Sequence, residues 1–366
     1  MADTSVSYKC PSCSAPLPFR PGEEKAVCEY CGTEFEISVL EELYRKEEER
    51  AAQAAAAQEA KWDTEAAGSE WTEEEAALLR VFTCSSCGAE LVCDENTMAT
   101  ECCYCGNPTL LPQRFDGMLK PDYIIPFKKT KQDAVAALKK FYEGKLLLPS
   151  AFTAGNRVEA IQPMYVPFWL FDSSVEAHAN FRASKDKVYE TSDEVITETS
   201  VYECNRSGNM SFSRIPVDGS EKMDDAYMDS VEPFDYQDLV PFQAAYLAGN
   251  LADKYDVEAD VSATRADSRV ETTAFGVLED SVTGYDRCER QQGSVVKQDG
   301  KVAYAMLPVW ILTTRYEGKP FTFMMNGQTG KVVGSLPIDK TKSFLYPTIF
   351  AAVLFPVVYI AMKALM

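Results

Sequence analysis

The sequence predicts an α+β multidomain protein with two small β zinc ribbons, a helical acidic linker, a duplicated α+β body with antiparallel sheets, and one C-terminal transmembrane helix. Three observations predict this organisation: a repeated pattern of cysteine pairs, a second repeat in the middle of the chain, and a charge-free apolar stretch near its end. The expected segments are ribbon 1 (1–37), the linker (38–80), ribbon 2 (81–113), lobe 1 (114–235), lobe 2 (236–338) and the membrane helix (343–363).

Each ribbon contains two Cys-x-x-Cys pairs that are separated by fourteen residues. Two such pairs on adjacent turns can place four thiolates tetrahedrally around one Zn²⁺. A unit of about 28 residues buries too little surface to fold alone, so we expect the metal to hold it folded. Aligning the two copies favours Cys102 over Cys103 as a ligand. The predicted ligands are Cys10, Cys13, Cys28 and Cys31 in ribbon 1, and Cys84, Cys87, Cys102 and Cys105 in ribbon 2.

Four cysteine ligands leave no open coordination position, so we expect two structural zinc ions and no catalytic one. Disulfides would require an export signal, and the first nine residues contain no apolar segment of that kind. A thioredoxin-like redox pair would require a single Cys-x-x-Cys within a βαβ pattern. Rubredoxin-like iron uses similar ligands, and the sequence leaves zinc and iron open. The other cysteines are expected to be buried thiols in a reducing compartment: Cys93, Cys103, Cys204 and Cys288.

Charge weighs against nucleic-acid binding. The formal net charge is −20, and residues 82–110 of ribbon 2 contain four acidic residues and no Lys or Arg. Affinity for nucleic acid depends largely on neutralising phosphates with basic side chains. Four thiolates around each zinc ion add further negative charge. The ribbons are therefore expected to bind protein.

The linker is rich in strong helix formers and in acidic residues. Residues 41–75 carry twelve acidic and four basic side chains, with a thin apolar stripe. This composition favours a solvated helical spacer, although an acidic docking helix for a basic partner would look similar. Thr72 and Glu75 have the spacing of a capping box, which predicts that a short helix starts there.

The body contains a second repeat. Ile124–Phe127 leads into a helical pattern at 131–142, and Leu239–Phe242 leads into a similar pattern at 243–255. Each is followed by an apolar strand with a Pro-x-Trp motif, at Pro167–Trp169 and Pro308–Trp310. This order predicts two related α+β lobes. Proline inside these strands suggests strand edges or bulges.

Other elements follow from alternation and turn residues. We expect strands at 194–203 and 210–217 joined by a turn at 205–209, and one further helix at 265–278. A meander is expected at 302–315, 320–325 and 331–334, where Asn326-Gly327 and Thr329-Gly330 supply turns.

The segment 343–362 has twenty residues without a charge, enough to span roughly 30 Å of hydrocarbon as a helix. Lys340, Lys342 and Lys363 flank it, as expected at membrane interfaces. The prediction is a single-pass C-terminal anchor in the cell membrane, favoured over a buried core helix, with the bulk of the chain cytoplasmic.

Nothing in the sequence forms a catalytic constellation. His178 is the single histidine, which leaves little room for histidine-based catalysis, and we expect no enzyme activity, no catalytic residue and no cofactor-binding residue. One acidic stretch could hold Ca²⁺ or a catalytic carboxylate pair, but a solvated or partner-binding face is favoured, since Met223, Met228 and Phe234 lie between its charges. Its acidic residues are Asp218, Glu221, Asp224, Asp225, Asp229, Glu232, Asp235 and Asp238.

Several motifs resemble a known family over nearly the whole chain. They are Pro216–Gly219, Met223–Asp225, Met228–Tyr236, Pro167–Leu170, Leu307–Trp310 and Asn326–Lys331. The resemblance is to bacterial membrane proteins with TFIIB-type zinc ribbons, which are often mislabelled as primosomal replication helicases. It implies a membrane-associated scaffold, and some relatives are linked to SPFH-type and phage-shock-type envelope-stress proteins.

These observations predict a membrane-anchored, cytoplasm-facing zinc-ribbon adaptor for protein partners, with residues 343–363 in the lipid bilayer. A helicase is excluded, because the sequence has no phosphate-binding loop. The alternative is a membrane-tethered transcription or replication regulator that binds nucleic acid or RNA polymerase through its ribbons. An enzyme that uses the acidic stretch ranks last.

Overall fold

The computed structural model describes residues 8–12, 15–17, 25–40, 42–43, 45, 60–94, 97, 101–108, 110–113, 118–155, 158–190 and 194–365. The fold is mixed α+β, as predicted, and it divides into two compact units. Unit 1 contains Met1–Asp63, Phe171–Ile215 and Ala263–Lys301, and unit 2 contains Thr64–Leu170, Pro216–Ser262 and Val302–Met366. Both units draw on both predicted lobes, so the expected boundary at residue 235 does not separate them.

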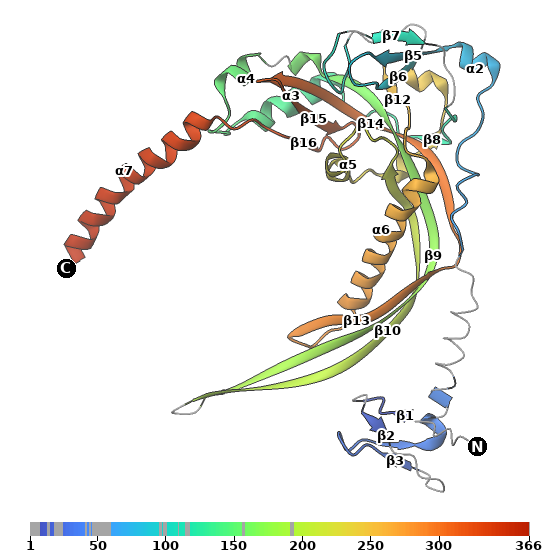
Figure 1. Ribbon diagram of the computed structural model, residues 1–366, viewed down its shortest axis with the longest axis vertical. Coiled ribbons are helices and arrows are strands. Elements are labelled where there is room, and N and C mark those ends of the chain that lie inside the picture. Colours follow the sequence, from blue (N-terminus) through green and yellow to red (C-terminus); the bar gives the residue numbers. More distant parts are fainter. Residues whose placement is uncertain are drawn as a thin grey trace. The chain divides into compact units, whose positions relative to one another are not determined.

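Unit 2 is built on one mixed sheet with strand order β11-β8-β14-β9-β12-β6-β5-β7, and β15 and β16 continue from β14 (Figure 1). Its strands are β5 (Leu79–Cys84), β6 (Glu90–Asp94), β7 (Leu110–Gln113), β8 (Tyr123–Ile124), β9 (Gln162–Glu190), β11 (Val240–Pro241), β12 (Leu251–Asp253), β14 (Lys301–Tyr316), β15 (Lys319–Asn326) and β16 (Val332–Gly334). Its helices are α2 (Glu73–Ala77), α3 (Lys131–Tyr142), α4 (Ser150–Gly155), α5 (Asp225–Val231) and α7 (Lys340–Leu365), with short 3₁₀ turns η1 (Val158–Ala160), η2 (Tyr236–Asp238) and η3 (Ala244–Leu247).

Two apolar clusters form the core of unit 2. One packs α5 against the first part of β9 and the middle of β14, with Phe168, Met228 and Leu307 fully buried. The other packs α3 and α4 against β14 and β15, around Phe152 and Phe323. The capping boxes that start α2 at Thr72 and α3 at Thr130 are both formed, which confirms the start predicted at Thr72.

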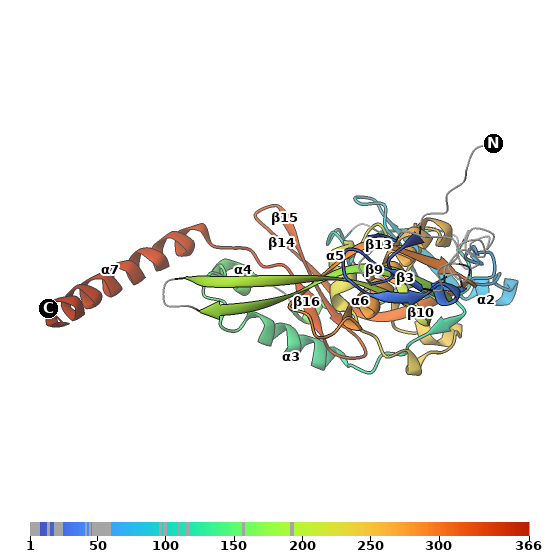
Figure 2. The ribbon, with the colours of Figure 1, turned by 90° about the horizontal axis from the view of Figure 1, so that it is seen from below.

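Unit 1 is organised on the later part of β9, which pairs with β10 (Val195–Asp218) and β13 (Arg287–Lys297). Figure 2 shows β9 and β10 lying side by side. The helix α6 (Ala259–Asp280) confirms and extends the one predicted at 265–278, and Ala274 and Leu278 pack on Phe181. The predicted turn at 205–209 is wrong, because β10 runs through it without interruption.

The described end of the linker is packed against unit 1. The Trp62 ring lies 4.9 Å from Phe171, and its Nε1 donates to Asp267 Oδ1 at 2.9 Å. Lys297, whose side chain is 7% exposed, pairs with the same carboxylate at 2.7 Å and lies over the Trp62 ring. This part of the linker is therefore not a solvated spacer; the part at 46–59 lies outside the described residues.

The two repeats of the body exchange strands. β8, which precedes α3, pairs in parallel with β14, so that Tyr123 faces Ala305. β12, which precedes α6, pairs in parallel with β9, so that Leu251 faces Met164. Each helix is thus preceded by a strand that pairs with the Pro-x-Trp strand of the other repeat.

The same hydrogen-bond pattern occurs in both repeats. Trp169 Nε1 donates to the carbonyl of Val257 at 2.8 Å, two residues before α6, and Trp310 Nε1 donates to the carbonyl of Lys129 at 3.0 Å, two residues before α3. A loop glycine completes each copy: Gly219 N donates to Pro167 O at 2.9 Å, and Gly327 N donates to Pro308 O at 2.8 Å. The internal duplication seen in the sequence is therefore visible as repeated geometry.

This geometry corrects two predictions. The helix expected at 243–255 is wrong, because this stretch forms η3, a turn with Gly249 at φ +76°, and β12. The structural counterpart of α3 is α6. The two prolines lie inside central strands, so the expected edge position is wrong, whereas the bulge stays a prediction; their carbonyls accept the bonds from the loop glycines.

Ribbon 2 is part of the body sheet. Its strand β6 pairs with β12, so that Val92 faces Ala252 and Leu91 faces Asp253. The predicted meander near the C-terminus is confirmed as β14, β15 and β16.

The C-terminal helix α7 starts at Lys340 and contains Pro347 and Pro356. Within the described residues, no helix combines the length and the apolar character needed to cross a membrane. The predicted membrane helix at 343–363 includes side chains outside the described set, such as those of 353, 357 and 359–361, and it stays a prediction.

The loop glycine of the second repeat gives a test of the duplicated geometry. A Cβ at Gly327 would lie 2.6 Å from the Phe127 ring and 2.9 Å from Pro308 Cβ. We expect Gly327→Ala to reduce the free energy of unfolding by about 1–3 kcal/mol, because the packed neighbours must shift. Urea unfolding followed by tryptophan fluorescence measures this loss. The matched control is Gly208→Ala, where a Cβ meets nothing within 4 Å; equal stability of the two variants would contradict the packing described.

Candidate metal centres and the acidic loop

Ribbon 2 brings its four predicted cysteines together. The Sγ atoms of Cys84, Cys87, Cys102 and Cys105 all lie within 4.8 Å of one another. Cys84 and Cys105 are 3.6 Å apart, and Cys87 and Cys102 are also 3.6 Å apart. Tetrahedral zinc with Zn–S bonds of about 2.3 Å requires sulfurs about 3.8 Å apart. The cluster therefore has the dimensions of a four-thiolate metal site.

The backbone explains why the cysteines converge. The N–H of Cys84 donates to Ala89 O at 2.9 Å, and the N–H of Gly88 donates to Cys84 O at 2.9 Å. The second turn repeats this pattern, with Cys102 N to Asn107 O and Gly106 N to Cys102 O, both at 2.8 Å. Gly88 and Gly106 adopt φ of +72° and +67°, which favours glycine at both positions. Each turn thus presents its two sulfurs on one side.

The environment of Cys102 favours its thiolate. Its pKa is lowered to about 4, first by the hydrogen bond from Cys103 and also by the backbone N–H groups of Cys105 and Tyr104. Burial raises the pKa of the Cys87 thiol. A bound cation would offset the free-energy cost of ionising the buried Cys87 thiol, since metal ligation requires the deprotonated thiol.

Cys103 lies beside Cys102 but is not one of the four grouped cysteines. It is 4% exposed, and its Sγ lies 3.4 Å from Met164 Sδ in the core of unit 2. Burial raises its pKa well above the usual range. The structure therefore groups Cys102 and not Cys103 with the ligands, as the ribbon alignment favoured. Of the other cysteines, Cys93 and Cys204 are buried and Cys288 is half-buried.

Side chains of β14 hold ribbon 2 on the body. Thr313 Oγ1 donates to Cys103 O at 2.7 Å, and Arg315 Nε donates to Cys105 O at 2.9 Å. These contacts are in addition to the pairing of β6 with β12. No sequence signal predicts these contacts, because Thr313 and Arg315 lie more than 200 positions from the cysteines they contact, in an ordinary strand pattern.

Ribbon 1 brings together three of its predicted ligands, Cys10, Cys28 and Cys31; Cys13 lies outside the described residues. The Cys10 and Cys31 sulfurs are 3.6 Å apart. Its strands are β1 (Tyr8–Lys9), β2 (Pro16–Leu17), β3 (Lys25–Val27) and β4 (Glu34–Glu36), in two two-stranded sheets. The apolar cluster around the cysteines is small, with Leu17, Ala26 and Leu40 buried.

A buried carboxyl lies beneath ribbon 2. Asp253 is 1% exposed, and burial raises its pKa to about 7. The hydroxyls of Ser220 and Tyr104 lower the pKa of Asp253, but neither hydroxyl reaches good hydrogen-bonding geometry with the carboxyl. The position corresponds to Ile125 of the other repeat, which is fully buried. Sequence reasoning missed Asp253, because the strand β12 around it was expected to be helical.

The acidic stretch serves mainly to shape its own loop. Asp224 caps α5 by accepting from Ala226 N at 2.9 Å, and Asp235 caps η2 by accepting from Gln237 N at 3.1 Å. Met223, Met228 and Phe234 are buried in the core and do not form part of a partner surface, which corrects that expectation. Among the described residues, the groups that could hold a metal ion are the two cysteine clusters.

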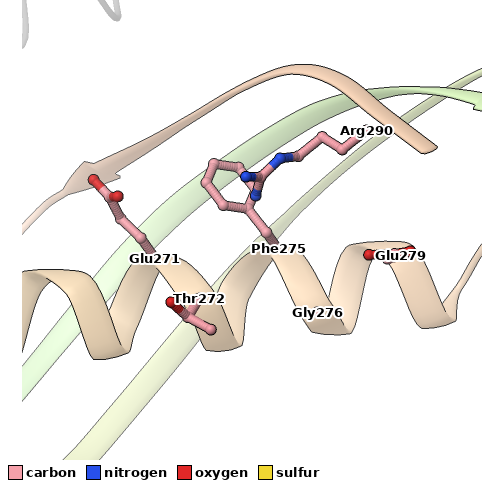
Figure 3. Close-up of a pocket in the computed structure, with 6 residues that line it drawn as sticks. All are labelled: Glu271, Thr272, Phe275, Gly276, Glu279 and Arg290. Carbon is pink, nitrogen blue, oxygen red and sulfur yellow. The ribbon is translucent and has the colours of Figure 1, made fainter.

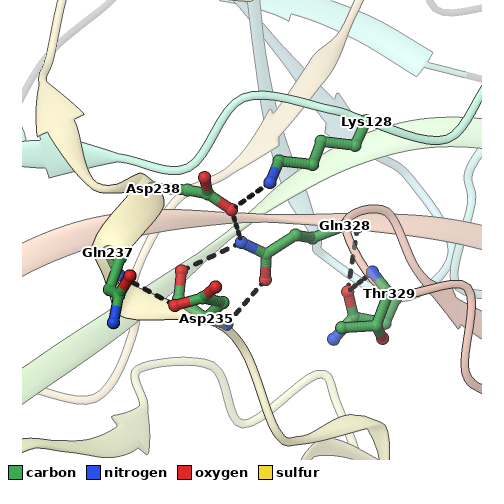
Figure 4. Close-up of polar contacts among 7 residues, drawn as sticks. Lys128, Asp235, Gln237, Asp238, Gln328 and Thr329 are labelled. Atoms are coloured by element: carbon green, nitrogen blue, oxygen red, sulfur yellow. Dashed lines mark hydrogen bonds and ion pairs between the residues drawn. The ribbon is translucent and has the colours of Figure 1, made fainter.

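A polar network ties this loop to the turn after β15 (Figure 4). Gln328 Oε1 accepts from Asp235 N at 2.7 Å, and its Nε2 donates to Asp235 O and to the Asp238 carboxylate. Lys128 pairs with the same carboxylate at 2.5 Å and lowers its pKa. Asn326, fully buried, donates to Val231 O at 3.1 Å and accepts from Gln328 N at 2.9 Å. Asn326 and Gln328 therefore position the loop.

Two further polar features lie in unit 1. His178 lies 3.1 Å from Glu176 on β9 and is half exposed. A groove on α6 is lined by Glu271, Thr272, Phe275, Gly276, Glu279 and Arg290 (Figure 3). The Arg290 guanidinium stacks 3.9 Å from the centre of the Phe275 ring. The groove presents two carboxylates, the Thr272 hydroxyl and one stacked cation.

The buried carboxyl predicts a pH dependence of stability. An unfolded Asp has a pKa of about 3.9, whereas Asp253 in the folded chain has a pKa of about 7. Between these two pKa values, the Asp253 carboxyl is protonated in the folded chain and ionised in the unfolded chain. The contribution of Asp253 to the free energy of unfolding therefore falls as pH rises from about 4 to about 7. We expect Asp253→Asn to gain stability over the natural chain by on the order of a few kcal/mol near pH 7.5, and to lose that advantage near pH 4. Urea unfolding of both chains across this range measures the difference; parallel pH curves would contradict the burial of a protonated carboxyl.

Comparison with known proteins shows similarity to a curated protein. No family model and no solved structure matches the chain. Among curated proteins, the uncharacterized protein YdjG of Bacillus subtilis (strain 168) is 33% identical over 337 residues, which cover 92% of each chain. That name assigns no activity. The chain belongs to the same family as Bacillus subtilis YdjG.

Proposed function

We propose that the chain is a membrane-anchored adaptor that faces the cytoplasm and binds protein partners through its zinc ribbons. The observation that carries this proposal is the exposure of apolar side chains around α7. Phe344, Leu345 and Tyr346 are consecutive and are 78%, 47% and 40% exposed. Since consecutive helical residues point about 100° apart, no single partner surface covers all three. A helix that is apolar all round suits a bilayer.

The flanks of α7 support the same proposal. Lys340 and Lys342 precede the uncharged stretch, and Lys363 follows it. Lysines at both ends of an apolar helix can extend their amines to the headgroups. The twenty uncharged residues at 343–362 have the length of a hydrocarbon core. We therefore propose α7 as a single-pass C-terminal anchor.

We propose zinc as the ion in both cysteine clusters, in a structural role. The sulfur spacing in ribbon 2 supports a tetrahedral four-thiolate site, and three of the four expected ligands converge in ribbon 1. Bound metal would supply the cross-link that each small ribbon needs to stay folded. Such a site offers no position for a substrate.

Metal analysis tests this assignment. We expect two zinc ions per chain, one fewer in Cys84→Ser/Cys87→Ser, one fewer in Cys28→Ser/Cys31→Ser, and no loss in the control Cys288→Ser. Bound iron would instead support a rubredoxin-like site.

A strong chelator should also expose ribbon 1 to proteolysis before ribbon 2, because ribbon 2 is held by β12, Thr313 and Arg315 as well. Cleavage of both ribbons at the same rate would contradict that difference.

Charge supports protein and not nucleic acid as the partner. Ribbon 2 carries no Lys or Arg between Phe82 and Leu110, and thiolate ligation adds negative charge. The family resemblance points to SPFH-type or phage-shock-type membrane proteins as partner classes. The alternative, a membrane-tethered regulator that binds RNA polymerase or DNA, predicts DNA affinity that falls steeply between about 50 and 200 mM salt.

A crosslinked pull-down from detergent-solubilised membranes distinguishes these functions. It compares the full chain with a form that ends at Asp339, with the two ribbon variants, and with Cys288→Ser. We expect a discrete membrane protein that is recovered with the full chain and the control, and lost with a ribbon variant or with the truncated form. Recovery of polymerase subunits or nucleic acid in its place would favour the regulator.

A further inference from the structure

We propose that the junction between α3 and α7 is a lipid-binding surface that holds unit 2 against an anionic bilayer. The junction consists of the end of α3, the loop at 143–149, and residues 338–342 at the start of α7. This inference rests on the proposed membrane anchor, and it adds a specific surface and a class of lipid to it.

Hydrogen bonds join the parts of the junction. Asp339 N donates to Leu147 O at 2.8 Å, and Lys342 Nζ donates to Leu148 O at 2.7 Å and to Ser150 Oγ at 3.3 Å. The Asp339 carboxylate caps α7 by accepting from Thr341 N and Lys342 N. The first turn of α7 is therefore fixed to the loop that follows α3, both in unit 2 (Figure 1).

Large apolar side chains are exposed at this junction. Leu146 is 72% exposed, Leu147 37% and Ile338 65%. Phe344 and Leu345, which follow Ile338 at the start of α7, are also exposed. Single exposed apolar residues are ordinary, but a contiguous group of them marks an interaction surface. Next to a membrane helix, such side chains suit the boundary between headgroups and acyl chains.

Lysines surround these apolar residues. Lys139, Lys140, Lys145 and Lys340 are exposed, and Lys342 lies at the junction itself. The acidic residues in the same segments are Glu143 and Asp339, and the Asp339 carboxylate is bound to backbone N–H groups. The junction is thus locally basic in a chain whose formal net charge is −20.

The occupant that fits this combination is an anionic bilayer. Basic residues near a membrane helix are attracted to acidic headgroups, and each contributes roughly a fivefold increase in affinity close to the surface. A soluble acidic protein would match the lysines, but it would not explain apolar side chains that continue into the first turns of α7. Lipid satisfies both features at once.

Photo-crosslinking of the full chain in nanodiscs tests the proposal. Leu146 is replaced by p-benzoylphenylalanine, in discs of zwitterionic lipid and in discs that also contain anionic lipid. We expect a phospholipid adduct at position 146 that is several-fold more abundant with anionic lipid. The same crosslinker at Leu111, which is 51% exposed on β7 at the other end of the strand order, should give no lipid adduct.

Charge variants complete the test. Lys139→Glu/Lys140→Glu should lower the adduct several-fold in anionic discs, whereas the matched control Lys185→Glu/Lys187→Glu on β9 should leave it unchanged. Lys139→Gln/Lys140→Gln, which disturbs the end of α3 less, should give an intermediate loss, and zinc content verifies folding. An adduct that is independent of lipid charge, or that joins position 146 to protein, would overturn the proposal.

Entry of the full chain into the nanodiscs tests the proposed anchor separately from the junction surface. If the full chain enters both kinds of disc but position 146 does not reach lipid, the junction surface is refuted and the anchor stands. If the chain enters neither kind of disc, the anchor is refuted and the junction surface falls with it.

Discussion

The exchange of strands between the two repeats is the constraint on which the rest of the body depends. β8 pairs with β14 and β12 pairs with β9, so each repeat completes the sheet of the other. The Trp169 and Trp310 indoles then fix the turns that start α6 and α3, while Pro167 and Pro308 accept from the loop glycines. Each of these strand pairs takes one strand from each repeat. The body therefore cannot be divided between the two copies without breaking the sheet. Ribbon 2 joins the same sheet through β12, which makes it an extension of the body.

The two ribbons consequently share a ligand pattern but differ in what supports it. In ribbon 2, the turn that contains Cys102 and Cys105 accepts hydrogen bonds from Thr313 and Arg315, and the strand β6 pairs with β12 of the body sheet. In ribbon 1, the described residues form two two-stranded sheets around a few buried apolar side chains. A sheet of two strands is marginal without a further constraint. A bound metal would thus be one of several supports in ribbon 2 and, within the described residues, the main support in ribbon 1.

Sequence reasoning succeeded where the signal was local. The Cys-x-x-Cys spacing predicted the ligand cluster of ribbon 2, the periodicity at 131–142 predicted α3, and Asn326-Gly327 predicted the turn after β15. It failed where tertiary pairing decides. Gln243–Tyr255 has helical periodicity, yet its C-terminal part is needed as the strand that pairs with β9, and Gly249 breaks the helix before it. Asp253 was missed for the same reason, and Met228 and Phe234 were read as surface residues although α5 and the loop that follows it bury them in the core. Neither pairing partners nor the direction in which a short helix faces is encoded in spacing alone.

Net charge is a poor guide to any single face of this chain. Many of the acidic residues at 218–238 cap helices or pair with nearby groups, as Asp224, Asp235 and Asp238 do. The exposed lysines at the end of α3 lie in a short segment next to the start of α7. At physiological ionic strength, charges further apart than about 8 Å are largely screened from one another. A surface that approaches the α3–α7 junction therefore meets its local lysines and exposed leucines, and the acidic groups elsewhere contribute little to the attraction.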